Sequence, residues 1–547
     1  MSAKAWASEP DHKQTGWPAG VPFIIGNEGC ERFSFYGMKS ILQIHLTALF
    51  VLQGIGNEVL AEEHAQELVH LFIAGVYAFP MIGALVADRL WGKYNTILWL
   101  SLVYCAGHGV LAVSEDTVGG MYLGLALIAI GSGGIKPCVS ANVGDQFGRS
   151  NWHLVTKVFQ AFYFIINFGS FFATLMIPWL KQEYGASVAF GIPGVLMFIA
   201  TIIFWAGRNK FIHIPPKPAG RLGVYDALSS SLLFMGFIGL PMFFTDILSI
   251  TALLATMAIS IIAGFAIFNR RQSIEQDDGF LAVTIYAVRN LLSGENKRLI
   301  AVADQPEDQH DLRRNWLFCS AREKFGQEVT EGPVAVLRII SVFFLVSVFW
   351  ALFDQHSSSW IRQAKRMDLH VALLNIDLLP SQIAALNPLM VMILIPINNF
   401  FIYPAMEKLG LALTPLRKMT IGMFMAAVAF AAVALIQMQV DASQETGVLV
   451  PVAWQVLPYF IMTQAEVMVS ITGLEFAYTQ APRRMKSTIM GFWLLTVALG
   501  SKLVIIVTQM PDMGLTKFFW VFAVLMAAAA MLFGLRARFY TGKDYSQ

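Results

Sequence analysis

Charged residues are scarce in this chain of 547 residues: they make up 14% of it, whereas soluble domains carry roughly 25%. Lysine and arginine together number 38 against 36 aspartate and glutamate residues, so the chain lacks the basic excess that attracts nucleic acid. Cysteine is also rare, and Cys30, Cys105, Cys138 and Cys319 form no C-x-x-C pair. We therefore expect no nucleic-acid partner, no disulfide framework and no metal site.

Hydrophobic residues dominate instead, at 56% of the chain, and the mean hydropathy is +0.59. Because a membrane helix needs about 20 mainly apolar residues, the pattern predicts fourteen transmembrane helices and an all-α polytopic membrane protein. Their predicted bounds are 21–50, 66–88, 94–114, 119–145, 155–180, 188–207, 224–245, 247–269, 333–355, 380–406, 415–438, 450–480, 486–509 and 515–536.

A polar stretch at 270–332 divides these helices into eight and six. It contains runs such as EQDD and GENKR, which are too charged to span a membrane, so we interpret it as a soluble insert. The predicted organisation is a tail at 1–20, an N-terminal six-helix bundle at 21–207, a linker with two additional helices at 208–269, the insert at 270–332, a C-terminal six-helix bundle at 333–538 and a tail at 539–547.

Basic residues near the predicted helix ends, such as Arg149 and Arg208, fall on one side of the membrane. Since lysine and arginine collect in cytoplasmic loops, we expect both termini and the insert to be cytoplasmic. The first 20 residues show no cleavable signal pattern, so the first helix is expected to act as the insertion signal. Two six-helix halves joined by a cytoplasmic linker form the layout of major facilitator transporters, which bind substrate between the halves.

The loops on the opposite side carry acidic residues, and Glu58, Glu62 and Glu63 are predicted to lie in the first of them. One loop breaks the pattern, because it carries the basic run RQAKR at 362–366.

The first predicted helix holds four charged residues at bilayer depth, Glu28, Glu31, Arg32 and Lys39. Each costs about 2.5–3.5 kcal/mol to insert. Positions 28, 32, 35 and 39 share one helical face, with Glu31 one step aside, so we expect this face to line a polar cavity. The alternative is a buried ion-pair cluster with a purely structural role.

Further polar residues interrupt later helices. Lys136, in GSGGIKPCVSAN, needs an anionic partner, for which Glu28 or Glu31 is the natural candidate. Glu466 lies mid-helix and is a candidate for binding a cation or a proton. Arg338 and Asp354 lie sixteen residues apart on one helix, too far to pair, so each is expected to bridge to another helix as part of a gate.

Each of the remaining polar and aromatic residues has two interpretations, one with a role in transport and one with a structural role. His70 lies towards the outer end of the second predicted helix, where imidazole titrates near neutral pH, but an interfacial histidine without a transport role fits equally. Asn167 and Asn387 are candidates to bond a peptide amide or to hold helices together. The aromatic residues that are candidates for lining pockets, with ordinary helix packing as the alternative, are Tyr36, Tyr77, Trp350, Phe492 and Trp493.

Three motifs resemble those of one family. Residues 28–33, EGCERF, fit the E-x-x-E-R-F motif of the proton-dependent oligopeptide transporters, a branch of the major facilitator superfamily. GSGGIKPCVSANVGDQF and FYFIINFGS fit two further signatures of that family, and GALVADRLWGKY from Gly83 to Tyr94 is similar to the superfamily motif between helices two and three. FWALFDQ, ALNPL and GLEFAYTQAP extend the resemblance through the second half.

The resemblance implies a role for each matching residue. Glu28, Glu31 and Arg32 would couple proton movement to transport, and we add His70, Asp354 and Arg338 as gate and proton-coupling candidates. The residues that would contact substrate are Arg32, Lys39 and Lys136 around the peptide carboxylate, Glu466 at the ammonium, Asn167 and Asn387 at the backbone, and Tyr36, Tyr77, Trp350, Phe492 and Trp493 at the side chains. Gly83, Asp88 and Arg89 would brace the conformation through a loop.

Some positions depart from the family pattern. Phe35 stands where many members have tyrosine, and Lys39 replaces an arginine of several bacterial members, so a point charge replaces a bidentate fork. His70 matches a histidine of animal peptide transporters, whereas the two additional helices resemble bacterial members. A bacterial inner-membrane protein with an animal-like site is the resulting expectation.

The expected function is proton-coupled import of di- and tripeptides by alternating access, by a monomer that needs no cofactor besides protons. One alternative is a carrier of the same family for nitrate or an organic anion, which would not require Glu466. A membrane-embedded enzyme or a peptide sensor is a second alternative, but no H-E-x-x-H or G-x-S-x-G motif is present and the insert is small for a signalling domain.

Overall fold

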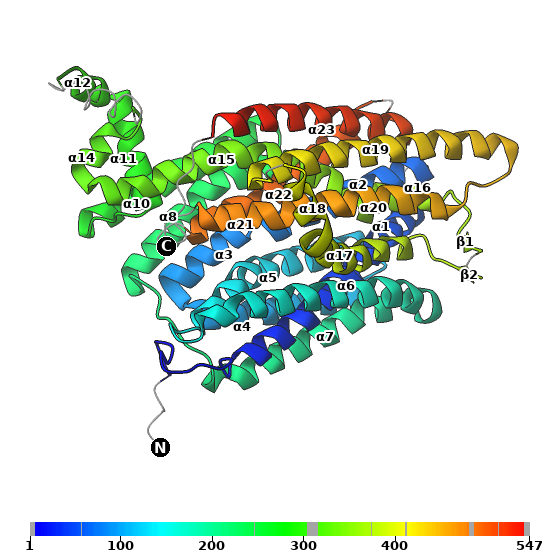
Figure 1. The fold of residues 1–547 in the computed structure, drawn as a ribbon, viewed down its shortest axis with the longest axis horizontal. Helices are drawn as coiled ribbons and strands as arrows, with labels where there is room; N and C mark the ends of the chain where they lie inside the picture. The colour runs from blue at the N-terminus through cyan, green and yellow to red at the C-terminus, as the bar shows by residue number, and fades with distance from the viewer. Residues whose placement is uncertain are drawn as a thin grey trace.

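The fold is a bundle of long helices, known here from a computed structural model that describes residues 6–55, 57–245, 247–302, 316–372, 375–410, 413–480, 486–511 and 513–540. The helices run side by side along the long axis of the molecule (Figure 1). The described ends of the chain and the short helices of the insert lie at one end of the bundle, and a small β-hairpin lies at the other.

The N-terminal half is formed by α1 to α7. Its elements are α1 Val21–Leu52, α2 Glu58–Ala78, α3 Pro80–Val86, the π-helical turn η1 Ala87–Trp91, α4 Lys93–Val113, α5 Val118–Asp145, η2 Trp152–Leu154, α6 Val155–Tyr184, α7 Ala186–Ala206 and η3 Gly207–Asn209. Polar caps begin two of these helices: the side chains of Asn57 and Thr117 accept hydrogen bonds from backbone N–H groups in the first turns of α2 and α5.

Two additional helices and the insert follow. Their elements are α8 Gly220–Phe234, η4 Met235–Gly239, α9 Leu240–Phe243, α10 Ile250–Ile274, α11 Phe280–Leu292, α12 Glu295–Val302 and α14 Cys319–Phe325. The predicted insert folds in part into helices, since α11 and α14 share a small apolar core that includes Val283 and Phe318. Residues 303–315 of the insert lie outside the described residues.

The C-terminal half contains the remaining helices. Its elements are α15 Gln327–Phe353, η5 Asp354–Ser357, α16 Ser359–Ala364, β1 His370–Val371, β2 Ile376–Asp377, η6 Gln382–Ala385, α17 Leu386–Ile397, η7 Asn398–Ile402, α18 Tyr403–Lys408, α19 Pro415–Thr446, η8 Val452–Gln455, α20 Val456–Glu466, η9 Val467–Ile471, α21 Thr472–Thr479, α22 Lys486–Thr508 and α23 Leu515–Arg538. Strands β1 and β2 pair antiparallel.

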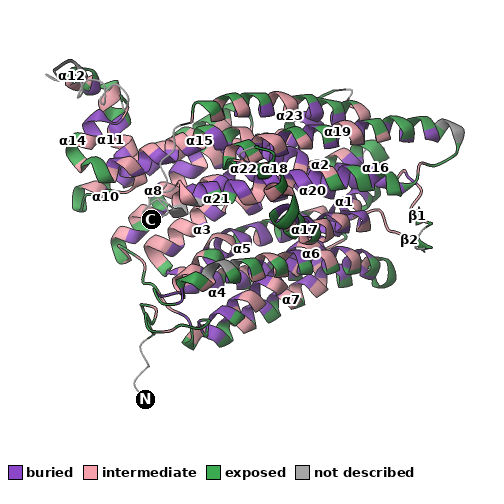
Figure 2. Cartoon of the chain, in the orientation of Figure 1, coloured by how far each residue is buried: buried purple, intermediate pink, exposed green. Residues whose placement is uncertain are grey.

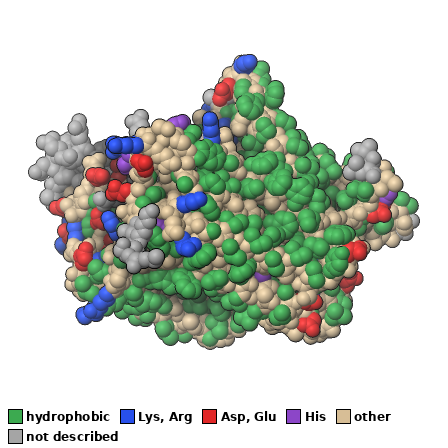
Figure 3. Space-filling model, turned by 90° about the horizontal axis from the view of Figure 1, so that it is seen from below, with side chains coloured by type: hydrophobic (Ala, Val, Ile, Leu, Met, Phe, Trp, Pro, Cys, Tyr) green, Lys and Arg blue, Asp and Glu red, His purple; other side chains and the backbone are tan. Residues whose placement is uncertain are grey.

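The apolar surface is that of a multi-pass membrane protein. Among the described residues, thirteen helical segments are long and apolar enough to cross a membrane. The remaining predicted helix, 450–480, agrees with Val456–Thr479, which Glu466 and Glu475 interrupt. Hydrophobic side chains cover the broad middle of the face in Figure 3, whereas charged ones gather towards the ends. Ile259 and Ile262 of α10 are each 67% exposed, as side chains that face lipid would be.

Burial marks where the helices meet. Buried residues concentrate on central helices such as α1, α2 and α22, whereas exposed residues cover the outer side of α23 (Figure 2). Helix α2 of the first half packs along α22 of the second, and α6 packs on α17. The two halves therefore touch along their inner helices, and any cavity between these helices is enclosed by both halves.

Several predicted boundaries were wrong for a common reason. Helix α2 begins at Glu58 and not at 66, α15 begins at Gln327 inside the predicted insert, and α10 continues to Ile274. Asp88 and Arg89 belong to η1 and not to a loop. At α2, η1 and α10 charged residues pair with groups far along the chain, Glu62 with Arg362 and both Arg89 and Arg271 with Asp226, and a hydropathy average does not reveal such partners.

Candidate functional site

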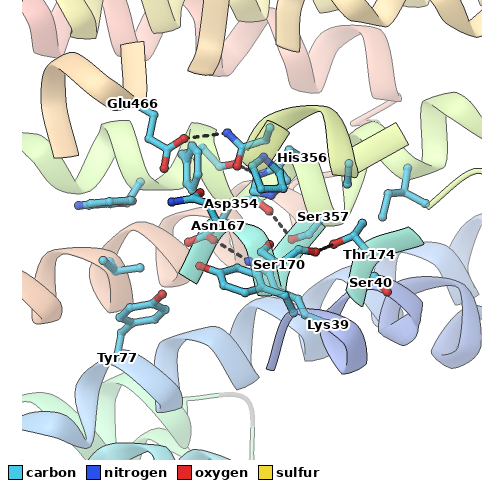
Figure 4. A pocket seen from close by; sticks show the side chains of 18 residues that line it. Lys39, Ser40, Tyr77, Asn167, Ser170, Thr174, Asp354, His356, Ser357 and Glu466 are labelled. Atoms are coloured by element: carbon cyan, nitrogen blue, oxygen red, sulfur yellow. Dashed lines mark hydrogen bonds and ion pairs between the residues drawn. The ribbon is translucent and has the colours of Figure 1, made fainter. Parts of the chain in front are cut away.

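A small cavity lies between the two halves near the middle of the bundle (Figure 4). Its volume is about 60 Å³, and its wall is built from α1, α2 and α6 on one side and from α15, η5, α16, η6, α17, α20 and α22 on the other. Eight of the predicted site residues line it: Tyr36, Lys39, Tyr77, Asn167, Trp350, Asp354, Asn387 and Glu466.

Glu466 supplies a negative charge on the wall of the C-terminal half. One of its carboxylate oxygens accepts a hydrogen bond of 2.7 Å from Nδ2 of Asn387, which also donates to Thr463 Oγ1 at 3.2 Å. Among the described residues no cation lies within ion-pair distance of this carboxylate. The site therefore offers an oriented, uncompensated carboxylate to whatever enters the cavity.

Lys39 and Asp354 join the two halves across the cavity. Lys39 Nζ of α1 lies 2.9 Å from Asp354 Oδ1 of η5, and both side chains are 5% exposed. The second carboxylate oxygen of Asp354 and Nε1 of Trp350 have no hydrogen-bond partner among the described residues. The predicted bridge from Asp354 to another helix is thus present, and unsatisfied polar atoms remain on the cavity wall.

The two carboxylates of the first motif hold Arg32 beside the cavity. Arg32 Nε lies 2.7 Å from Glu28 Oε1 and 2.8 Å from Glu31 Oε2. None of these three residues belongs to the cavity wall, although Tyr36, one turn further along α1, does. In this conformation the guanidinium is committed to the carboxylates of its own helix.

The predicted ion pair between Lys136 and Glu28 or Glu31 is not formed among the described residues. The Lys136 ammonium instead lies 4.4 Å from the ring centre of Phe35 and 5.0 Å from that of Tyr77. Cation–π contacts of this kind stabilise a desolvated ammonium. Because Arg32 occupies both carboxylates, the aromatic rings are the partners that remain.

A second contact between the halves follows one face of α2, where Glu62, Gln66 and His70 recur every four residues. We call it the outer seam. Glu62 Oε2 lies 3.2 Å from Arg362 Nε and 3.0 Å from Arg366 Nη2.

Further bonds extend the outer seam along α2 beyond Glu62. Arg362 also donates to Gln66 at 2.8 Å, Gln66 donates to Thr508 at 3.0 Å, and His70 Nε2 lies 2.9 Å from Ser358 Oγ. The basic run at 362–366 breaks the charge pattern of the loops because its cations pair with α2 across the seam.

Three further predicted residues also lie away from the cavity wall. Phe492 meets Phe280 of α11, with ring centres 6.0 Å apart, and Trp493 is buried 4.9 Å from the ring of Phe343. Arg338 lies on α15 and forms no ion pair with the part of the chain that the structure describes. The predicted pocket role of Phe492 and Trp493 does not apply to this conformation.

The superfamily motif ties α3 to its neighbours. A Cβ at Gly83 would collide with the backbone of Gly133 in α5, so glycine is required where these helices cross. Arg89 Nη1 lies 3.3 Å from Asp226 of α8 and 3.5 Å from Asp277 after α10. The motif therefore braces the additional helices, and Asp88 lies beside it on η1.

The sequence reading missed some residues of the wall. Ser170 and Thr174 were missed, although they follow the predicted Asn167 on one face of α6, at i+3 and i+7, and that spacing of small polar residues in an apolar helix was a usable signal. His356 was missed as well, since it follows Asp354 on the 3₁₀ turn η5 and gives no helical periodicity.

Comparison with known proteins agrees with this geometry. The model of the POT family matches residues 94–239 and 250–526. This chain belongs to the POT family. Peptide transporter family 1 of Drosophila melanogaster is 34% identical over 439 residues, which cover 78% of this chain and 48% of that protein. Solute carrier family 15 member 2 of Homo sapiens is 32% identical over 441 residues, 78% of this chain and 50% of that protein. The chain thus spans about half the length of these curated relatives.

Solved structures of POT family members match almost the whole chain. The POT family transporter PepTSo is 40% identical, with a TM-score of 0.75, over 96% of this chain and 99% of that one. An auto-inhibited POT family peptide transporter is 36% identical, with the same TM-score, over 97% and 99%. The predicted family and the major facilitator fold are confirmed.

Proposed function

We propose that this protein is a symporter that uses a proton gradient to import di- and tripeptides by alternating access. The observation that carries the proposal is the pairing of opposite charges in one cavity, with the Glu466 carboxylate on one half and the Lys39 ammonium on the other. A short peptide is a zwitterion, so its ammonium suits Glu466 and its carboxylate suits the cations of α1 and α5. The peptide transporters among the relatives support the same substrate class.

The size of the cavity supports alternating access. Its 60 Å³ is well below the roughly 300–1,000 Å³ of pockets that enclose a small ligand. A dipeptide therefore needs the two halves to move apart. Opening towards the outside requires the Lys39–Asp354 pair and the outer seam to break, and both consist of ionisable groups.

Protons are the proposed coupling ion, with no further cofactor. Each proton that enters down 100 mV supplies about 2.3 kcal/mol, enough to concentrate a solute several tens of times. Glu28, Glu31 and Asp354 are proposed acceptors, because protonation weakens the ion pair that each makes with Arg32 or Lys39. His70 is a further proposed acceptor, since its ring bonds Ser358 of the other half and protonation makes both ring nitrogens donors.

We place the protein in a bacterial inner membrane as a monomer, with both termini and the insert in the cytoplasm. The described ends of the chain and helices α11, α12 and α14 all lie at one end of the bundle, which is consistent with that orientation. Trp6, close to the described N-terminal end, contacts Tyr94 and His213, so the neighbouring basic residues Lys93 and Arg208 lie near the same end, which agrees with the charge rule for cytoplasmic loops.

Uptake of labelled dialanine into proteoliposomes tests the function. We expect the wild-type protein to accumulate dialanine only under an inward proton gradient. Glu28→Gln is expected to keep counterflow exchange within about twofold but to lower accumulation at least tenfold, because its carboxylate no longer binds and releases a proton.

A substitution of similar chemistry at an exposed position, Glu183→Gln at the end of α6, serves as the control and should behave as the wild type. If a folded wild-type protein fails to take up dialanine but accumulates nitrate or an organic anion under the same gradient, the substrate assignment is wrong.

A further inference from the structure

Helix α4 carries a buried polar stripe that the proposed transport site does not use. Ser101, Tyr104 and His108 lie at i, i+3 and i+7 on one face and are at most 1% exposed. The hydroxyls of Ser101 and Tyr104 and both ring nitrogens of His108 have no hydrogen-bond partner among the described residues. The backbone of Phe190 on α7 lies close to the ring of His108.

Helix α1 presents a matching face. Asn27, Glu31 and Ser34 lie at i, i+4 and i+7 on one face, which is turned towards α7. Asn27 Nδ2 donates to the carbonyl of Ala200 at 2.9 Å, and Ser34 Oγ donates to that of Pro193 at 2.6 Å. Glu31 lies between them and is fully buried. Its Oε2 pairs with Arg32, whereas its Oε1 and the Oδ1 of Asn27 have no partner among the described residues.

Helix α7 places the two faces at the same depth. At one level, Ser34 bonds Pro193, and a Cβ at the adjacent Gly194 would lie 2.8 Å from the Cβ of His108. At a second level, nearer the C-terminal end of α7, Asn27 bonds Ala200, and Oγ1 of the adjacent Thr201 lies 3.8 Å from Cys105 Sγ. Glu31, midway between Asn27 and Ser34, is therefore level with the stripe from Tyr104 to His108.

Other charges around this space are few. Glu28 and Arg32 lie on α1 and Lys136 on α5, and α7 has no charged residue from Ala186 to Ala206. Of the charges around this space, that of Glu31 lies on the face of α1 that is turned towards α7, at the depth of the stripe.

We propose that Asn27, Glu31, Tyr104 and His108 form a binding site for a small cluster of water, the Glu31 chamber, which exchanges the proton of Glu31. Buried polar groups of native proteins are nearly always satisfied, and where protein partners are absent ordered water supplies the bonds. The proton passes from the carboxyl O–H of Glu31 to the nearest water and leaves the carboxylate paired with Arg32. Tyr104 and His108 act as positioning residues for that water. This role deepens the proposed proton coupling and rests on it.

Infrared spectroscopy of the purified protein tests the chamber without any substrate. The C=O stretching band of protonated Glu31 is assigned as the band that Glu31→Gln removes. We expect Tyr104→Phe and His108→Gln each to shift this band to higher frequency, because the carboxyl loses hydrogen-bonded neighbours. Tyr184→Phe, at a 62% exposed position on α6, is the matched control and should leave it unchanged.

Transport gives the second measurement. Tyr104→Phe is expected to preserve counterflow exchange within about twofold but to lower gradient-driven accumulation about tenfold and to shift the pH of half-maximal uptake by about one unit. Unchanged band positions and pH profiles in both variants would overturn the chamber, as would an equal loss of exchange and accumulation. Failure of the wild type to accumulate dialanine would instead count against the proposed function, and the infrared shift would still decide the chamber.

Discussion

Replacing Glu62 with glutamine is expected to open the protein at the end where β1 and β2 lie. Glu62 is the shared partner of Arg362 and Arg366, and the Arg362 side chain is 8% exposed. Removing one member of a buried ion pair costs about 3–5 kcal/mol, since the other charge stays buried and unpaired. Opening relieves that cost by admitting water to Arg362, so the open population should rise about 100-fold or more.

Cysteine accessibility measures this shift. In a background with the four native cysteines replaced by serine, Thr174→Cys places a thiol on the wall of the cavity. A membrane-impermeant reagent added outside should label it about 100-fold faster when Glu62→Gln is present. Glu63→Gln is the matched control, because Glu63 forms no ion pair with the described residues. Equal labelling of Thr174→Cys in the two variants would refute the role assigned to the outer seam.

The outer seam also shows where sequence reasoning falls short. Hydropathy predicts a loop at Glu58, Glu62 and Glu63, because acidic residues lower the local average. The helix forms nevertheless, since Asn57 caps its first turn and the cations at 362–366 neutralise Glu62 from 300 residues away. A window of neighbouring residues contains no information about that partner.

Much of the candidate site could be predicted, for the opposite reason. Charges such as Glu28, Lys39 and Glu466 stand out against apolar helices, and the cost of burying a charge marks them as functional whatever their partners are. Which groups pair is decided by the packing of the two halves. Lys136 illustrates this. The carboxylates of Glu28 and Glu31, which were expected to pair with it, pair with Arg32, and the Lys136 ammonium lies over the ring of Phe35.

Aromatic residues were predicted less well than charges. Trp350 lines the cavity, whereas Phe492 packs against Phe280 of α11. Helix α11 belongs to the insert, for which the sequence predicted no helices. An aromatic side chain is stable in a membrane core, at a helix interface or in a pocket, so the residue type alone does not distinguish these places.

Glu466→Gln is expected to weaken dialanine binding about 100-fold or more. Truncating one partner of a buried hydrogen-bonded charge pair costs about 2–5 kcal/mol. Here the carboxylate is already oriented by Asn387 at 2.7 Å and has no other cation within ion-pair distance among the described residues, so a peptide ammonium would supply its single positive partner. Calorimetric titration of the purified variant with dialanine measures the loss.

The ligand provides the decisive control for this prediction. N-acetyl-dialanine lacks the ammonium, so it should bind the wild type and Glu466→Gln equally weakly, and the two changes should not add, because they remove the same ion pair. Glu475→Gln, nine residues along the chain and outside the cavity, should bind dialanine as the wild type does. Additive losses from acetylation and from Glu466→Gln would mean that the ammonium binds elsewhere, and Asp354, with an unpartnered carboxylate oxygen on the same wall, would become its partner.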